Sequence, residues 1–239
     1  MLTPAELRKN IQMNNLISGQ NSSWVEELNP HLGDVRPDQR HSSQLAIAAK
    51  YAKTTLCTQL FWEHGSLAVL QQLTSTWACI QALTVAGTGP VAMYHLQRTT
   101  AFSESLRVGL TTTFKYTEPS ATPAEGLPYI LGALDSAGQA HPSRTACAIL
   151  HCSSSGRALA CFYSRRLGLY IVFDPSPPRR IPEAKQGGPT FFVHNKWTRA
   201  MGCIRELFIG EPVESLSPGV LASARGRDLV EAYIVTARA

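Results

Sequence analysis

The sequence predicts an α+β fold in which an N-terminal helical half packs on a C-terminal antiparallel sheet. Apolar residues recur at helical spacing through the first third of the chain, and three apolar runs separated by short turns follow residue 144. With 239 residues, 44% of them hydrophobic, the chain can bury a sizeable core. We predict an extension over residues 1–42 and a single domain over 43–239, with a helical half at 43–110 and a sheet half at 111–239.

The extension begins with a strong helix start. Thr3 can cap, Pro4 suits the first helical position, and Glu6 completes a capping box, so a helix is expected to run to about Ile17. Residues 18–42 are rich in Ser, Asn, Gly, Pro and Asp. We predict a loop there that packs one turn of helix around Trp24, Val25 and Leu28.

The helical half contains two predicted helices. The first begins behind a Ser43 cap and reaches about Trp62, because Leu45, Ala48, Ala52, Leu56 and Leu60 recur near helical spacing. Gly65–Ser66 interrupts this pattern, and a second helix is expected from Leu67 to about Ile80. Ser66 then stands at a helix start, where a structural capping role competes with any chemical role.

The segment from residue 91 to residue 144 gives weaker signals. We predict a helical turn over Ser103–Leu110, a strand over Thr111–Tyr116 and a proline-containing loop over Glu118–Gly126.

The sheet half gives the clearest pattern of the chain. Hairpin-sized connections at Ser153–Gly156 and Ser164–Gly168 separate three apolar runs, which predicts an antiparallel meander. Continuous apolarity over Ala146–Leu150 and Tyr170–Phe173 indicates strands covered on both faces.

After Phe173 the chain enters a proline-rich loop and returns as a predicted strand over Thr190–His194. The spacing of the apolar residues from Trp197 to Phe208 then predicts a helix. A last element over Leu229–Val235 could be either helix or strand.

Composition narrows the function classes. The net charge is +5, and 13 of 22 Lys and Arg but only 7 of 17 Asp and Glu lie from residue 140 onward. This basic bias suits acidic partners and is too mild to indicate nucleic acid. The six cysteines lack disulfide-framework spacing, and no signal peptide or membrane-spanning run occurs, so we expect a soluble cytoplasmic or nuclear protein.

Two arginine pairs follow successive predicted strands. Arg165–Arg166 and Arg179–Arg180 can form a basic rim that grips carboxylates or phosphates, or they can be ordinary solvated loop charge. No metal or other cofactor is predicted. His151, Cys147, Cys152 and Cys161 lack paired zinc-ligand spacing, and neither Gly87–Pro90 nor any other segment matches a phosphate-binding loop.

Asp174 is the main candidate for a catalytic or cation-binding residue, because it is the polar residue that ends a strongly apolar strand. A carboxylate at a strand end can orient a histidine or bind a cation. Asp before Pro is also a common turn opener, whose side chain accepts hydrogen bonds from nearby amides.

A family resemblance involves this corner. The segments ACAILHC, RALACFY, LGLYIVFDPSPP, GPTFFVH and WTRAMGCIRELF resemble the C-terminal half of papain-like ubiquitin-specific cysteine peptidases, among them the herpesvirus tegument proteases. The resemblance spans about 65 residues and implies a papain-like fold. Its motif is Asp-Pro-His, in which Asp and His are the catalytic acid and base. Asp174 and Pro175 match, but Ser176 stands in the histidine position.

The remaining catalytic positions also depart from the family. Serine cannot exchange a proton near neutral pH as imidazole does. On the nucleophile side, the segment nearest to the family's cysteine is Gln59–Ser66, with Ser66 at the helix start. Cys57 lies close by, and His194 is the best substitute for the base. The weaker histidine candidates are His64 and His151.

Two hypotheses about function follow. The first is a catalytically degenerate papain-like domain that binds a protein partner, with ubiquitin or a ubiquitin-like protein suggested by the resemblance. The second is an active thiol isopeptidase, a deubiquitinase, using Cys57, His194 and Asp174. Ser176 opposes activity, so the first hypothesis leads.

Overall fold

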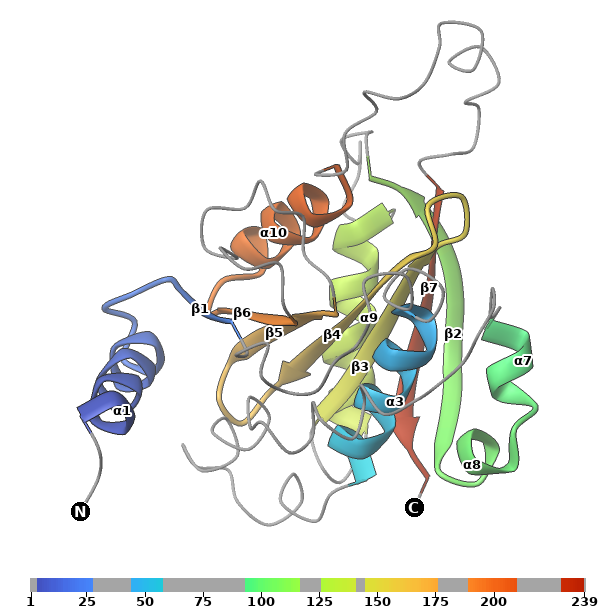
Figure 1. The fold of residues 1–239 in the computed structure, drawn as a ribbon, viewed down its shortest axis with the longest axis horizontal. Helices are drawn as coiled ribbons and strands as arrows, with labels where there is room; N and C mark the ends of the chain where they lie inside the picture. The colour runs from blue at the N-terminus through green and yellow to red at the C-terminus, as the bar shows by residue number, and fades with distance from the viewer. Residues whose placement is uncertain are drawn as a thin grey trace, which may run out of the picture.

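The computed structural model describes residues 4–27, 44–57, 93–116, 126–140, 145–175, 189–209 and 229–238. Helices and one seven-stranded antiparallel sheet make up this part of the chain, which confirms the α+β class (Figure 1). Among the described residues, no helix has the length and apolarity needed to cross a membrane.

The sheet has the strand order β1-β6-β5-β4-β3-β7-β2, and neighbouring strands pair antiparallel. The strands are β1 (Ser23–Glu27), β2 (Leu106–Lys115), β3 (Thr145–Cys152), β4 (Arg157–Ser164), β5 (Leu169–Asp174), β6 (Thr190–His194) and β7 (Leu229–Ala237). The predicted meander is confirmed as β3-β4-β5. The last element is a strand, and it lies between β3 and β2 (Figure 1).

Helices cover both faces of the sheet. The described helices are α1 (Pro4–Ile17), α3 (Gln44–Cys57), α7 (Met93–Gln97), α8 (Thr100–Ser103), α9 (Gly126–Ala140) and α10 (Trp197–Ile209). In Figure 1, α3 crosses the front of the sheet and α9 is seen behind it. This cover explains why β3, β4 and β5 are apolar and buried on both faces, as the sequence predicts for β3 and β5.

Each face has its own hydrophobic core. On the α3 face, the Tyr51 ring lies 4.2 Å from the Phe173 ring and 5.4 Å from those of Phe162 and Phe191. On the other face, buried leucines and isoleucines of α9 and α10 pack on alternate residues of the same strands. Because side chains alternate along a strand, each residue of the meander is assigned to one face.

Two local predictions are wrong. Trp24 and Val25 lie in strand β1, where the sequence predicts one turn of helix, because the backbone of this segment pairs with β6. The predicted helical turn over Ser103–Leu110 is also wrong from Leu106 onward, since β2 begins there and pairs with β7. In both places, long-range pairing overrides a weak local pattern.

The first helix and the strand and helix after the proline-rich loop are confirmed, as α1, β6 and α10. The helix predicted behind Ser43 is confirmed over Gln44–Cys57. The sequence prediction contains no helix at α9, although its buried residues Leu127, Ile130, Leu131 and Leu134 follow helical spacing.

The predicted extension and domain share one sheet. Strand β1 of the extension forms one edge of the sheet, while Met13 and Leu16 of α1 are buried in the α3-side core. Several predictions lie outside the described residues. They concern Thr3, Leu28, the Ser43 cap, Ser66, the Leu67–Ile80 helix, most of the Glu118–Gly126 loop, Ser176, Arg179 and Arg180.

Candidate functional site

The sheet separates the predicted catalytic residues along its strands. Asp174 pairs with Thr190 at one end of the β5-β6 ladder, whereas His194 pairs with Tyr170 at the other end. Four residue steps along a strand correspond to about 13 Å. Asp174 and His194 are therefore not brought together.

Asp174 is bound to an arginine. The Arg157 guanidinium on β4 donates from Nη2 to Asp174 Oδ2 over 2.5 Å, and the two side chains are 1% and 0% exposed. Strand alternation places both on the sheet face covered by α9 and α10. A buried carboxylate paired in this way neutralises a buried cation and clamps β4 to β5.

His194 is buried and uncharged at neutral pH. Its Nδ1 lies 2.8 Å from the hydroxyl of Ser23, across the β1-β6 pair. Burial, together with the positive charge of Arg199, lowers the pKa of His194 to about 4. Its Nε2 is also buried and lacks a hydrogen-bond partner. A general base must come within hydrogen-bond distance of the substrate proton that it abstracts. With Nδ1 bonded to Ser23 and Nε2 buried, the His194 ring does not offer a nitrogen to a substrate.

Cys57 lies near the opposite edge of the sheet. It is the exposed last residue of α3, and its Sγ contacts the Ser105 carbonyl oxygen at 3.6 Å. Ser105 directly precedes β2, which is five strand spacings from β6, or about 24 Å. Burial raises the pKa of the Cys57 thiol, and nearby Lys53 only partly opposes the shift, so the thiolate is scarce at neutral pH.

The predicted basic rim is described only at its first arginine pair. Arg165 and Arg166 are exposed in the turn between β4 and β5. Arg165 Nη1 lies 4.0 Å from Asp135 Oδ1 on α9, a pair that is partly exposed to solvent. Such a pair contributes little to stability. Because both arginine side chains of the turn are exposed, their guanidinium groups are accessible to ligands.

Beside this turn lies a row of polar side chains that the sequence did not predict. The rings of Tyr163 on β4 and Tyr170 on β5 stack with centroids 4.5 Å apart and planes at 28°. The backbone register continues this row through His194 to Ser23, across β4, β5, β6 and β1. The alternation of residues along each strand could have shown which side chains share a face. Only the register between strands shows that these four residues are neighbours.

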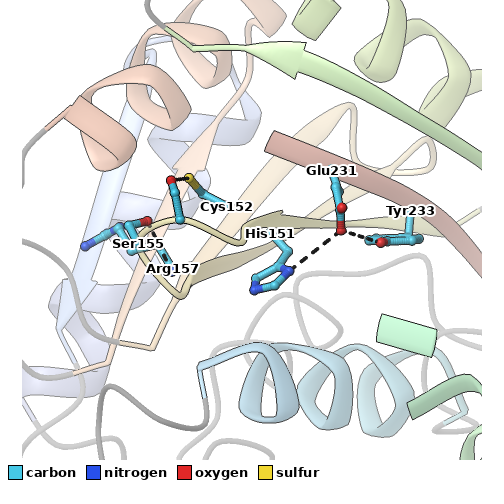
Figure 2. A network of polar contacts seen from close by, with 7 residues as sticks. His151, Cys152, Ser155, Arg157, Glu231 and Tyr233 are labelled. Atoms are coloured by element: carbon cyan, nitrogen blue, oxygen red, sulfur yellow. Dashed lines mark hydrogen bonds and ion pairs between the residues drawn. The ribbon is translucent and has the colours of Figure 1, made fainter. Parts of the chain in front are cut away.

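A second missed network involves β3 and β7 and is drawn in Figure 2. His151 on β3 faces Glu231 on β7, with Nδ1 3.9 Å from Oε2, and the Tyr233 hydroxyl donates to the same Oε2 over 2.6 Å. Burial lowers the pKa of His151, with Glu231 opposing the shift. Burial also raises the pKa of Tyr233, with Glu231 adding to the shift. The sequence separates these partners by about 80 positions, so no local pattern could reveal the network.

The N-terminus of α3 lies beside this network. The Gln44 side-chain oxygen accepts a hydrogen bond from the Ala158 amide over 3.2 Å, and Ala158 is the register partner of His151. Asp174 and Arg157 occupy the same end of the sheet but its opposite face. The sheet therefore separates His151 from the Asp174 carboxylate, and the two do not form one catalytic group.

Among the described residues, no group of three or more His, Cys, Asp or Glu side chains lies close enough together to hold a metal ion. The five cysteines of this part of the chain form no disulfide, and Cys147, Cys152 and Cys161 are buried in the sheet. Neither a known family model nor a curated protein matches the chain.

Proposed function

We propose that this chain is a catalytically degenerate protein-binding module on a papain-like scaffold. The observation that carries the proposal is the separation of the three predicted catalytic residues. Asp174 is held by Arg157 at one end of the sheet, His194 is buried at the other end, and Cys57 lies near the β2 edge. Hydrogen-bonded catalysis needs contacts of roughly 3 Å, which these positions do not provide.

Ubiquitin or a ubiquitin-like protein is the first partner to test. This choice rests on the resemblance of the β3 to α10 segments to ubiquitin-specific peptidases. The exposed arginines and half-buried tyrosines at the β4-β5 turn support a role in binding. A cytoplasmic or nuclear location, where thiols stay reduced, suits buried cysteines that form no disulfide.

The deciding experiment exposes the purified chain to ubiquitin that carries a C-terminal electrophile. We expect no covalent adduct by mass spectrometry, because burial raises the pKa of the Cys57 thiol and keeps the reactive thiolate scarce at neutral pH. The matched variants are Cys57→Ala and, for nonspecific alkylation, Cys203→Ala. An adduct that is lost only in Cys57→Ala would support an active thiol isopeptidase and contradict the proposal that the domain is catalytically degenerate.

Binding is tested separately by titrating the isotope-labelled chain with unmodified ubiquitin. Saturable amide shifts confined to one surface would support the partner. If ubiquitin and ubiquitin-like proteins cause no shifts at any concentration, the ubiquitin assignment is wrong.

A further inference from the structure

We propose that residues Tyr163, Arg165, Arg166, Tyr170, Lys196 and Arg199 form a docking surface for a Glu- and Asp-rich segment of a protein partner. We call these six residues the tyrosine–arginine surface. The proposal rests on the protein-binding function proposed above and specifies where binding occurs and what chemistry is bound.

The topology gathers these residues at one end of the sheet. The β4-β5 turn carries Arg165 and Arg166, and the β6-α10 connection carries Lys196. Because Tyr163 pairs with Tyr170 and Tyr170 with His194, the turn and the connection lie about two strand spacings apart, or roughly 10 Å. An extended peptide of a few residues can span this distance.

The two tyrosines supply hydroxyl donors. Burial raises the pKa of Tyr170 to about 12, and neighbouring Tyr163 and Asp135 add to the shift. The pKa of Tyr163 is raised for the same main reason. Both phenols therefore stay protonated at physiological pH, and each can donate a hydrogen bond to a carboxylate.

Positive charge dominates this surface. The side chains of Arg165, Arg166, Lys196 and Arg199 are all exposed, and Arg165 lies 4.0 Å from the carboxylate of Asp135. The last two cations stand at the start of α10, a 13-residue helix whose N-terminal amides also favour anions. Buried His194, with a pKa of about 4, adds no charge near neutral pH. Binding of acidic groups should thus depend on salt and change little between pH 6 and 8.

A protein carboxylate fits this surface better than a nucleic acid does. The Tyr163 and Tyr170 rings stack on each other, so they are not splayed as separate platforms for bases. Asp135 would also repel a continuous phosphate backbone, whereas separated side-chain carboxylates can avoid it.

The test measures fluorescence anisotropy of a labelled peptide in which Glu alternates with Gly, added to the full chain. We expect saturable binding that weakens at about 1 M salt, where the Debye length is about 3 Å. Arg165→Ser with Arg166→Ser should weaken binding about tenfold. Tyr170→Phe keeps the ring stack and should weaken binding roughly threefold, through loss of one donor.

The matched control is Arg98→Ser with Arg107→Ser. It removes two exposed arginines, one in the turn between α7 and α8 and one on the far-edge strand β2, and should leave affinity unchanged. Equal binding of the wild type and the Arg165/Arg166 variant would overturn the proposal, as would tighter binding of an oligothymidine than of the Glu peptide. If ubiquitin binds but the Glu peptide does not, the docking surface is wrong and the proposed function stands. If neither ligand binds, the docking surface and the ubiquitin assignment are both wrong.

Discussion

At the scale of single residues, the most consequential feature is the ion pair between Arg157 and Asp174. The resemblance to cysteine peptidases implies a catalytic role for Asp174, but the carboxylate is completely buried against a guanidinium that is itself only 1% exposed. Two buried opposite charges depend on each other, because either one left alone would lack compensation for its lost hydration. This geometry supports a structural role for Asp174.

Replacing Asp174 should therefore destabilise the folded protein. We expect Asp174→Asn to lower the free energy of unfolding by about 3 kcal/mol or more, because Arg157 keeps its charge in a buried site. The double variant Arg157→Met/Asp174→Leu should recover most of this loss. Urea unfolding followed by circular dichroism measures both.

The control for this change is Asp135→Asn, whose partly exposed ion pair with Arg165 should contribute under about 1 kcal/mol. If Asp174→Asn is as stable as the wild type, the ion pair is not structural and a chemical role for the carboxylate regains support.

At the scale of elements, the attachment of α1 and β1 depends on the connection between β6 and α10. The Asn195 side-chain amide donates to the Leu16 carbonyl at 3.2 Å and to the Asn21 carbonyl at 2.9 Å. Its backbone amide donates to the Ser22 carbonyl over 3.2 Å. One residue thus ties the last turn of α1 and the approach to β1 to the sheet.

Removing the Asn195 side chain should loosen these two elements selectively. We expect Asn195→Ala to speed amide hydrogen exchange in α1 and β1 and to cost about 1–2 kcal/mol of local stability, since two carbonyl groups lose their donor. Exchange followed by mass spectrometry gives the protection of each segment.

The neighbouring exposed residue Thr198 provides the control, because Thr198→Ala should not alter the protection of α1. Unchanged exchange in α1 and β1 of the Asn195 variant would mean that the core contacts of Met13 and Leu16 suffice to hold them.

At the scale of the whole molecule, the sheet has a hydrophobic core on each face, and its strand residues His194 and His151 are buried and uncharged near neutral pH. Burial lowers the pKa of His194 to about 4 and also lowers that of His151. The unfolded chain takes up protons at these rings near pH 6.5, whereas the folded chain does so only at lower pH. Global stability must therefore fall as the pH drops below about 6.5.

His194 alone should account for about 3 kcal/mol of the stability lost between pH 7 and pH 4. The variant His194→Asn has no ring to titrate at this position. Between pH 7 and pH 4, its free energy of unfolding should therefore fall by about 3 kcal/mol less than that of the wild type. Denaturant unfolding at a series of pH values measures the difference.

Ser23→Ala is the matched control, because it removes the hydrogen-bond partner of His194 but keeps the titrating ring. It should lower stability by about 1 kcal/mol and retain most of the pH dependence. If His194→Asn and the wild type lose stability in parallel, His194 does not control the acid response.

The candidate sites show how little of the chemistry could be predicted. Asp174 was identifiable as a polar residue ending an apolar strand, and Arg165 and Arg166 as exposed turn charges. The partner of Asp174, by contrast, lies 17 residues away on another strand, and Tyr163 meets Tyr170 only through the β4-β5 register. Contacts of this kind depend on strand alignment, which a single sequence does not specify.

The sequence by itself determined the α+β class, the β3-β4-β5 meander and the helices α1, α3 and α10. These elements carry strong periodicity, caps or turn residues, so local physics suffices to define them. Only the tertiary structure decided that β1 and β7 are strands, that β7 lies between β3 and β2, and that Asp174 faces Arg157. Those outcomes depend on which distant segment supplies the hydrogen bonds and the opposite charge, and that choice is made by the packing of the whole chain.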